Sequence, residues 1–355
     1  MAFSIALPNT QGLPSPQEIR EAYSEWSPNP EEFEFRDLLP DKPYKTPFIG
    51  YDVKGSPVDA LNENSIDSPP TPTPVRARTT VALTPIFKDR VEKVRPSDAV
   101  NQRALGALDE IDAWQQVADA FEDIAIATEV QQEKDRIAAL TGTLQPVLHG
   151  TNGQTYTYPV QVYTPSVLWD NIAATVVADL SAMADKVKGW GGECTLYLSR
   201  TVAINLLKNT QLVTLLAGSV HAPLLGMGGT AGLTIENKAI CEVLQIFTGI
   251  KTVKIYDKGW KSLNRANGVY TFNEFMPQKK VLLIATPPKG QKLGFFGLSP
   301  TTNLGGFTSP QPGKFLNSYD YSKIFPNGTY DLHGGFYGVP GIVFPNCVVV
   351  ATVLP

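Results

Sequence analysis

The sequence predicts a mixed α+β fold, and three observations support this prediction. The 355 residues include 29 prolines and 29 glycines, more than a fold built mainly of helices accommodates. One long segment around residue 120 has apolar residues at three- and four-residue spacing, which is typical of an amphipathic helix. Short runs of β-branched and aromatic residues follow this segment, and the strongest run is at the C-terminus.

The charge balance is slightly acidic. The formal net charge is −4 and the sequence pI is about 5.5, so we do not expect a protein whose main task is to neutralise phosphates. No apolar run reaches the roughly 18 residues of a membrane span, and residues 1–8 lack the basic region and cleavage site of a signal peptide. We therefore expect synthesis in a cytoplasm and no membrane partner.

The first 75 residues are rich in proline. They hold 13 of the 29 prolines and end in the run Ser68–Pro74, which predicts an extended arm without regular helix. Large apolar side chains recur along this arm and need a surface to cover, either the body of the chain itself or a neighbouring subunit. They are Tyr23, Trp26, Phe33, Phe35, Leu38, Leu39, Tyr44, Phe48 and Tyr51.

A basic stretch follows and leads into an acidic helix. From Val75 to Arg103 basic side chains outnumber acidic ones, and Thr79–Pro85 has the composition of a strand. The apolar spacing predicts a helix over Asp98–Leu140. We interpret the acidic faces of this helix as solvated surface. Their acidic residues are Asp109, Glu110, Asp112, Asp119, Glu122, Asp123, Glu129, Glu133 and Asp135.

Helices and strands alternate after this segment. Gly142 is placed as a helix C-cap, and the turn at 151–155 predicts a hairpin. A second helix is expected over Ser166–Lys188, ending before Gly189. Further helices are expected at Ser199–Asn209 and Asn237–Phe247. The expected strands are Glu193–Leu198, Lys251–Tyr256, Gly268–Phe272, Lys280–Ala285 and Gly341–Leu354, the last interrupted once by proline.

No motif in the sequence indicates catalysis. His149, His221 and His333 lie far apart beside glycine or proline, and we expect them in loops. Cys194, Cys241 and Cys347 are each in apolar company, which indicates small core residues. The segment Gly226–Gly232 lacks the lysine of a phosphate-binding loop and indicates a flexible loop. We predict no catalytic residue, metal site or cofactor, and therefore no enzyme.

The order of these parts carries more information than any single motif. An arm, a basic loop, a long helix, a hairpin and a large mixed domain resemble the lambda-type major capsid protein family of tailed phages. The resemblance depends on the segments Phe87–Arg90, Arg95–Ala99, Glu129–Gly142, Ile250–Asp257, Lys279–Pro287 and Phe295–Gly297 and on the apolar C-terminal strand.

The resemblance implies a Hong Kong 97-type capsid fold with five regions. These are an N-terminal arm at 1–45, an extended loop at 46–103, a peripheral domain with the long spine helix and a β-hairpin at 104–165, an axial domain at 166–335, and a C-terminal strand at 336–355 that returns to the peripheral domain. The proline-rich run at 68–74 has no counterpart in this pattern. No lysine and asparagine pair for covalent cross-linking is predicted.

The implied function is that of the major capsid (head) protein of a tailed bacteriophage. Such subunits self-assemble into hexamers and pentamers of an icosahedral shell that encloses double-stranded DNA. The implied partners are further copies of the chain, scaffold, portal and decoration proteins, and packaged DNA as a non-specific neighbour. The implied location is the virion, after assembly in the host cytoplasm.

The charge pattern adds a hypothesis about the subunit interface. The basic stretch of one subunit is expected to lie against the acidic helix of the next. The residues concerned are Arg76, Arg78, Lys88, Arg90 and Arg95 on one side and Asp109, Asp112, Asp119, Glu122 and Asp123 on the other.

Three alternatives remain open from the sequence. An encapsulin-like nanocompartment shell protein would share the fold and differ in its cargo. A soluble α/β hydrolase-type enzyme would be a monomer or small oligomer. A tail, adhesin or decoration protein is the third alternative.

Overall fold

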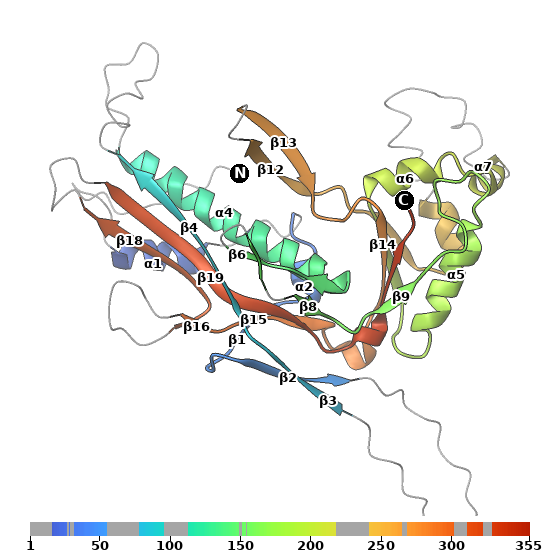
Figure 1. Ribbon diagram of the computed structural model, residues 1–355, viewed down its shortest axis with the longest axis horizontal. Coiled ribbons are helices and arrows are strands. Elements are labelled where there is room, and N and C mark those ends of the chain that lie inside the picture. Colours follow the sequence, from blue (N-terminus) through green and yellow to red (C-terminus); the bar gives the residue numbers. More distant parts are fainter. Residues whose placement is uncertain are drawn as a thin grey trace, which may run out of the picture.

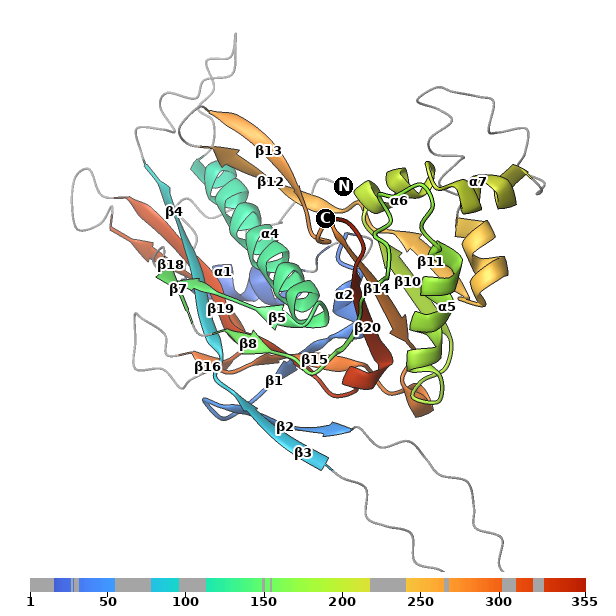
Figure 2. The ribbon, with the colours of Figure 1, turned by 45° about the vertical axis from the view of Figure 1, so that its right-hand side comes forward.

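The computed structural model describes residues 16–26, 28, 32–54, 78–95, 113–148, 151–153, 155–217, 241–264, 268–301, 311–321 and 329–355. This part of the chain contains two five-stranded sheets, and a 28-residue helix, α4 (Ala113–Leu140), lies across the first of them (Figures 1 and 2). The α+β class predicted from the sequence is confirmed.

The first sheet has the order β1-β15-β19-β18, and β4 also pairs with β19. Its strands are β1 (Asp41–Pro43), β4 (Ile86–Val94), β15 (Gly294–Leu298), β18 (Lys314–Asp320) and the 13-residue β19 (Tyr330–Ile342). Helix α4 packs closely on β19 because Gly334 has no side chain; a Cβ there would lie 2.4 Å from Ile124 of the helix. The long helix and this sheet therefore form one unit.

The second sheet has the order β11-β10-β14-β20-β9. Its strands are β9 (Gln161–Tyr163), β10 (Cys194–Leu198), β11 (Thr252–Ile255), β14 (Lys280–Ala285) and β20 (Val348–Thr352). Helix α5 packs on β14 and β20, and further helices lie beside it on the same side of the molecule (Figure 1). The helices on this side, α5 included, are α5 (Val176–Val187), α6 (Arg200–Leu206), α7 (Thr210–Ala217) and the helix at 241–248.

The chain crosses between the two sheets near its C-terminus. The single strand predicted over Gly341–Leu354 is two strands, because Pro345 starts a 3₁₀ turn, Pro345–Cys347, between β19 and β20. The last strand, β20, pairs with β14 and β9 in the second sheet. The C-terminal region predicted at 336–355 is therefore divided: its first part belongs to β19, which packs on α4, and its last part, β20, lies in the second sheet. Residue composition marks a strand but not its pairing partner.

The first sheet combines strands from several of the five regions predicted from the sequence. Strand β4 lies inside the predicted loop at 46–103, yet it pairs with β19 along its whole length. Strands β15 and β18 lie inside the predicted axial range and pair with β19 as well. Helix α4 is thus covered by strands from distant parts of the sequence.

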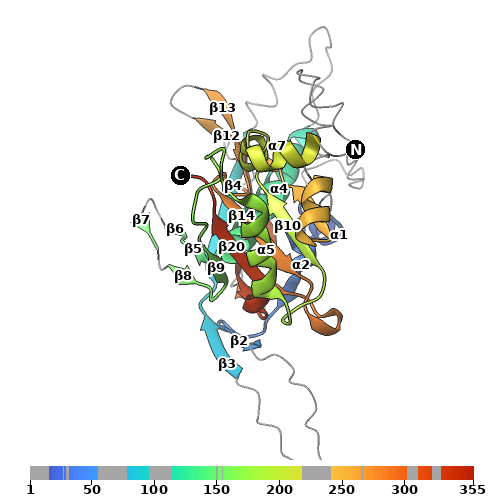
Figure 3. The same ribbon diagram turned by 90° about the vertical axis from the view of Figure 1, so that its right-hand side faces the viewer.

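Five two-stranded pairs complete the strand pairing of the described residues. One of them, β2–β3, extends from the first sheet, on the opposite side of the molecule from β12–β13 (Figures 1 and 3). The pairs are β2 (Ile49–Lys54) with β3 (Arg78–Leu83), β5 (Thr143–Leu144) with β8 (Tyr156–Thr157), β6 (Val147–Leu148) with β7 (Thr151–Asn152), β12 (Gly259–Asn264) with β13 (Val269–Glu274), and β16 (Pro300–Thr301) with β17 (Gln311–Pro312).

The arm contains helix, which corrects the prediction. Helix α1 (Pro16–Glu25) begins at a proline, where the missing N–H has no consequence, and α2 is Phe35–Leu38. Phe35 and Leu39 are fully buried in the main core of the chain. The apolar side chains at these positions therefore cover the body of the chain itself, one of the two predicted possibilities.

Some helix ends lie where the sequence predicts them, and others do not. Ser199 caps α6 by accepting a hydrogen bond from the Val202 N–H at 3.2 Å, as predicted. The second predicted helix starts ten residues late, at Val176. Trp169, before this start, is buried with its indole N–H donating to Asp179 at 2.9 Å. Positions 96–112, where the long helix was predicted to begin, lie outside the described residues.

Gly142 ends α4 with a φ of +97°. A side chain is disfavoured in this left-handed conformation, and a Cβ at Gly142 would lie 3.2 Å from Val160. We expect Gly142→Ala to lower the free energy of unfolding by about 1–2 kcal/mol, measured by urea denaturation. Gly50→Ala is the matched control, because a Cβ there meets nothing within 4 Å. Equal stability of the two variants would contradict this role for Gly142.

Candidate functional site

The predicted interface residues lie on two neighbouring elements. Helix α4 carries Asp119 and Asp123, which are exposed, and Glu122, which is half-buried. Strand β4, beside α4, carries Lys88 and Arg90. Arg95 follows β4 and is exposed, and Arg78 is the first residue of β3. Arg76, Asp109 and Asp112 lie outside the described residues.

Part of the expected charge pairing occurs within one chain. The Lys88 Nζ lies 2.7 Å from both carboxylate oxygens of Asp135 on α4. Asp135 is buried, and burial raises the pKa of its carboxyl although Lys88 opposes the shift. Arg90 pairs with Glu92 on the same strand. Lys88 therefore already has an acidic partner in its own subunit.

Three acidic residues of α4 are not solvated, which corrects the sequence interpretation. Glu129, Glu133 and Asp135 expose 1%, 0% and 2% of their surface. Glu129 and Glu133 share a helix face with Arg136, whereas Asp135 lies on another face and pairs with Lys88 of β4. Cations of the same chain therefore compensate all three charges. The sequence signal for this was the spacing of three or four residues between Glu129, Glu133 and Arg136.

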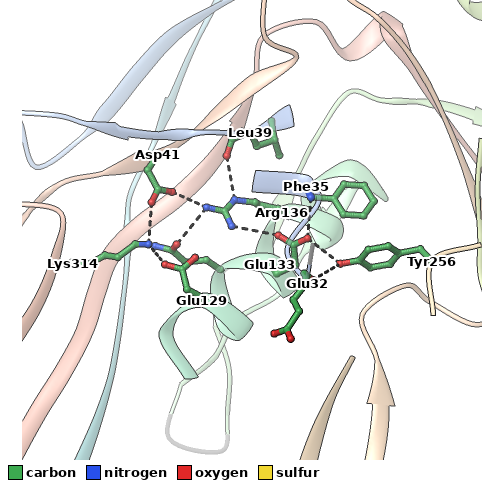
Figure 4. Close-up of polar contacts among 10 residues, drawn as sticks. Glu32, Phe35, Leu39, Asp41, Glu129, Glu133, Arg136, Tyr256 and Lys314 are labelled. Carbon is green, nitrogen blue, oxygen red and sulfur yellow. Dashed lines mark hydrogen bonds and ion pairs between the residues drawn. The ribbon is translucent and has the colours of Figure 1, made fainter. Parts of the chain in front are cut away.

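Arg136 is the centre of this buried cluster (Figure 4). Its side chain is fully buried. Its Nη2 lies 2.7 Å from Asp41 Oδ1, its Nε donates to the Leu39 carbonyl at 3.1 Å, and its Nη1 lies 3.4 Å from Glu133 Oε2. Lys314 of β18 lies 3.0 Å from Asp41 and also pairs with Glu129. The cluster fixes the arm residues 39–41 between α4 and the first sheet.

Glu133 joins three parts of the chain (Figure 4). Its Oε1 accepts hydrogen bonds from the Phe35 backbone N–H at 3.0 Å and from the Tyr256 hydroxyl at 3.1 Å. Tyr256 directly follows β11 of the second sheet. Burial raises the pKa of Glu133, and Arg136 and these hydrogen bonds oppose the shift. One carboxylate therefore links the arm, the long helix and the second sheet.

The raised pKa of Glu133 has a testable consequence. A carboxyl whose folded pKa is raised binds its proton more tightly in the folded state, so its contribution to stability increases as the pH falls through the raised pKa towards the ordinary value of about 4.3. The Glu133→Gln variant has no titrating carboxyl at this position, so its stability does not increase by this protonation. The melting temperature of the wild type minus that of the variant should therefore increase between pH 7 and about pH 4.5. A difference independent of pH would contradict this assignment.

Two hollows open along the outer face of α4. The first has a volume of about 690 Å³ and lies between α4 and β4; the second, of about 720 Å³, lies between α4 and the hairpin β12–β13. Both are lined by Arg90, Ala127, Gln131 and Lys134, so they adjoin over the helix.

The described residues show no cluster suited to metal binding. Among them, no group of three or more His, Cys, Asp or Glu side chains is suited to hold a metal ion. Burial raises the pKa of the Cys241 and Cys347 thiols to about 11, which disfavours the nucleophilic thiolate. Within the same ranges, each helix is too short or too polar to cross a membrane.

Two sequence interpretations need correction. Only Cys347 is a core residue, whereas Cys194 and Cys241 are half-buried beside the core. His333 lies in β19 and not in a loop; it is buried, with its Nε2 2.9 Å from Asp89 Oδ2 of β4. Its neighbouring glycines suggested a turn, but they serve the close packing of the first sheet. His149, His221 and the segment at 226–232 lie outside the described residues.

Several known structures are similar to this chain. A phage-related protein from Bordetella bronchiseptica RB50 is 11% identical with a TM-score of 0.52, covering 97% of this chain and 100% of that one. The capsid of the cyanophage P-SCSP1u is 12% identical, covering 90% and 87%, with a TM-score of 0.46. A Mycobacterium phage Che8 structure is 13% identical, covering 99% and 98%, with a TM-score of 0.47.

The sequence itself identifies the family. No curated protein sequence is significantly similar to the chain. The family described as Phage major capsid protein E matches residues 19–297, most of the sequence. The predicted Hong Kong 97-type fold and the role of a tailed-phage major capsid protein, a component of the virion, are confirmed. The chain belongs to the phage major capsid protein E family.

Proposed function

We propose that this chain self-assembles into hexamers and pentamers of a closed icosahedral shell around double-stranded DNA, in which each extended loop lies across a neighbouring subunit. The observation that carries the proposal is the hairpin β2–β3, which forms a two-stranded sheet of its own and extends from the body of the subunit (Figure 3). A two-stranded pair needs packing on another element, and one face of β2 packs on the chain's own core while its other face is open to contact with another molecule.

The hairpin is anchored at one side and open at the other. Ile49 is fully buried, the Tyr51 ring contacts Phe295, and the Lys54 N–H donates to the Val343 carbonyl at 2.8 Å. On the paired strand, Thr79 and Thr80 are exposed. A firmly held base with an open outer strand is suited to overlap a neighbour in the shell.

The remaining parts of the proposal follow from the role of a shell subunit. We infer assembly in the host cytoplasm, contacts with scaffold, portal and decoration proteins, and packaged DNA as a non-specific neighbour. We also infer that the chain has no catalytic activity. The family match favours this function over an encapsulin-like compartment or a soluble hydrolase.

The interface hypothesis becomes part of this proposal. Arg76, Arg78, Arg90 and Arg95 of one subunit would lie against the acidic side chains of α4 in the next. Lys88 is left out, because it pairs with the buried Asp135 of its own chain; Arg90 is kept, because its pair with Glu92 lies at the surface. The acidic partners would be Asp109, Asp112, Asp119, Glu122 and Asp123. Each exposed pair contributes only about 0–1 kcal/mol, so the effect depends on repetition around the shell.

A charge reversal tests the proposal. We expect the triple variant Arg76→Glu, Arg78→Glu, Arg90→Glu to form few or no shells, measured as sedimentable particles and by electron microscopy. The matched control reverses three exposed lysines outside α4, β3 and β4, and it should assemble; they are Lys208, Lys279 and Lys292. Normal shells from the triple variant would contradict the interface, and an equal defect in the control would show that net charge alone is responsible.

A further inference from the structure

We infer that arm residues 32–41 act as a latch between the two sheets: they stay fixed on the long helix, seat reversibly in an aromatic socket of the second sheet, and respond to pH through Glu133. The socket is formed by Tyr197, Tyr256 and Phe275. Opening of the latch moves the second sheet away from α4 at Glu133. The latch is a property of the single subunit, so it does not depend on the proposed shell.

The contacts of the latch with the socket are mainly aromatic. Phe35 is fully buried, and its ring centre lies 4.9 Å from that of Tyr197 on β10 and 5.2 Å from that of Tyr256. The Phe33 ring lies 6.3 Å from the Phe275 ring. Burial of apolar rings is non-directional, so these surfaces can part and meet again without leaving polar groups unpaired.

The polar contacts on this side can be replaced by water. The Lys254 Nζ lies 2.9 Å from Glu34 Oε2, and the two side chains expose 44% and 32% of their surface. Such exposed ion pairs contribute little, because solvent screens them. The Tyr256 hydroxyl donates to Glu133 at 3.1 Å and lies 3.3 Å from the Glu32 carbonyl oxygen (Figure 4). Water admitted by an opening can take the place of both partners.

The other side of the same segment is built into the first sheet. Strand β1, which continues the arm, pairs in parallel with β15. The fully buried Arg136 binds Asp41 and the Leu39 carbonyl. Release on this side would break a strand pairing and leave a buried charge without its partners. The arm should therefore move with α4, and the socket is the side that opens.

The pivot of this movement lies at the C-terminal end of α4. Ile137 and Leu140 follow Glu133 by about one and two turns of the helix. They are buried in a core that also contains Leu198 and Leu282 of the second sheet. This continuous core holds the two sheets together at the end of the helix. Opening at Glu133 therefore changes the angle between the sheets and leaves their shared core intact.

Glu133 makes the latch sensitive to pH. Its Oε1 accepts from Tyr256 only while the latch is closed, whereas Phe35 and Arg136 stay with it. Burial raises the pKa of Glu133 in the closed form, and contact with water returns this pKa towards the ordinary value of about 4.3. The closed form binds the proton more tightly, so closure is favoured as the pH falls through the raised pKa.

The other titratable and charged groups at this junction come from both sides of the latch. Burial and Glu133 raise the pKa of Tyr256, so its hydroxyl remains a donor. Arg136 keeps its charge at every pH considered. Glu133 accepts hydrogen bonds from both the arm and the second sheet. The remaining groups are Glu32, Glu34 and Asp41 in the arm, Glu129 on α4, Lys314 on β18, and Tyr197 and Lys254 on the second sheet.

Hydroxyl-radical footprinting of the unassembled subunit, read by mass spectrometry, tests the latch. Tyr256→Phe removes the hydroxyl and keeps the ring. We expect labelling of Phe35 and Tyr197 to increase about two- to tenfold, the range that the loss of one hydrogen bond allows. Labelling of Tyr158 should stay unchanged, because this ring is buried elsewhere and its hydroxyl donates to the Pro340 carbonyl.

A second variant weakens the latch at the surface alone. Glu34→Gln with Lys254→Gln should increase labelling of Phe35 about twofold. Glu193→Gln with Lys251→Gln is the matched control: it removes an exposed ion pair that lies on the second sheet only, and labelling of Phe35 should not change.

The response to pH is measured in the Glu34→Gln, Lys254→Gln background, so that titration of that surface pair does not contribute. Labelling of Phe35 relative to Tyr158 should decrease between pH 7 and about pH 4.5. Addition of Glu133→Gln should remove this decrease, because the variant has no carboxyl to protonate there.

Three results would overturn the inference. Unchanged labelling of Phe35 and Tyr197 in Tyr256→Phe would show that the socket does not open. An equal increase at Tyr158 would show that the whole subunit loosens and that no latch exists. The same response to pH with and without Glu133→Gln would reject Glu133 as the pH-sensitive group.

Discussion

Replacing Arg136 by methionine is expected to lower the free energy of unfolding of the subunit by about 3–5 kcal/mol. The guanidinium is fully buried and lies 2.7 Å from Asp41, with Glu133 on its other side. Methionine fills much of the volume but removes the cation that Glu133 and Asp41 share, while Asp41 keeps Lys314 at 3.0 Å. Domains of ordinary stability have about 5–15 kcal/mol in total, so this is a large loss.

Urea denaturation of the unassembled subunit measures this loss. Lys208→Met is the control, because it removes a positive charge from an exposed position; we expect it to change the stability by less than about 0.5 kcal/mol. If Arg136→Met unfolds at the same urea concentration as the control, the cluster does not anchor the arm. Asp41 supports the same cluster: despite burial, Lys314 and Arg136 hold the pKa of its carboxyl below its usual value.

Replacing residues 55–77 with a short glycine and serine linker is expected to abolish shell assembly while the subunit still folds. The segment lies beyond the register pair Lys54 and Arg78, so the linker leaves the pairing of β2 with β3 and the described core residues unchanged. The melting temperature of the unassembled subunit should therefore stay within a few degrees of the wild type. The loss of shells would follow from the loss of overlap between neighbours.

Sedimentation of the wild type and of this loop variant, at equal protein concentration, separates the two effects. The expected result is rapidly sedimenting wild-type particles and a slow, folded species from the variant. Normal shells from the variant would show that the overlap is not needed. A variant that does not fold would show that the loop belongs to the core, which would also contradict its proposed role.

The structural features that the sequence predicted best are those set by residues close together along the chain. The end of α4 followed from apolar spacing and from Gly142, whose positive φ suits glycine. The strands β10, β11 and β14 followed from runs of apolar and β-branched residues, and the cap of α6 from Ser199. These features are set within a few residues of chain, so a single sequence contains them.

Pairing over long distances was not predictable in this way. The passage of the chain from β19 to β20 places two adjacent apolar runs in different sheets, and only the surrounding strands decide this. The start of α5 was placed too early because the preceding residues look helical, whereas Trp169 is held by Asp179 and by the Val353 carbonyl. Helix α1 was missed since the prolines of the arm suggested extended chain.

The candidate site shows the same limit. The sequence revealed that a basic stretch precedes an acidic helix, but it could not show which charges meet inside one chain. Lys88 reaches Asp135, and Lys314 reaches Glu129 from far along the sequence. The acidic residues that stay at the surface, such as Asp123, differ from these only in the helix face they occupy.

Sedimentation and negative-stain electron microscopy of the purified, overexpressed protein test the central claim most directly. We expect closed shells, or rings of five and six subunits, and a sedimentation profile dominated by large particles. The contents of such shells, nucleic acid or a cargo protein, would then separate a phage head from a compartment. A stable monomer at every salt and protein concentration would contradict the claim that this chain builds a shell.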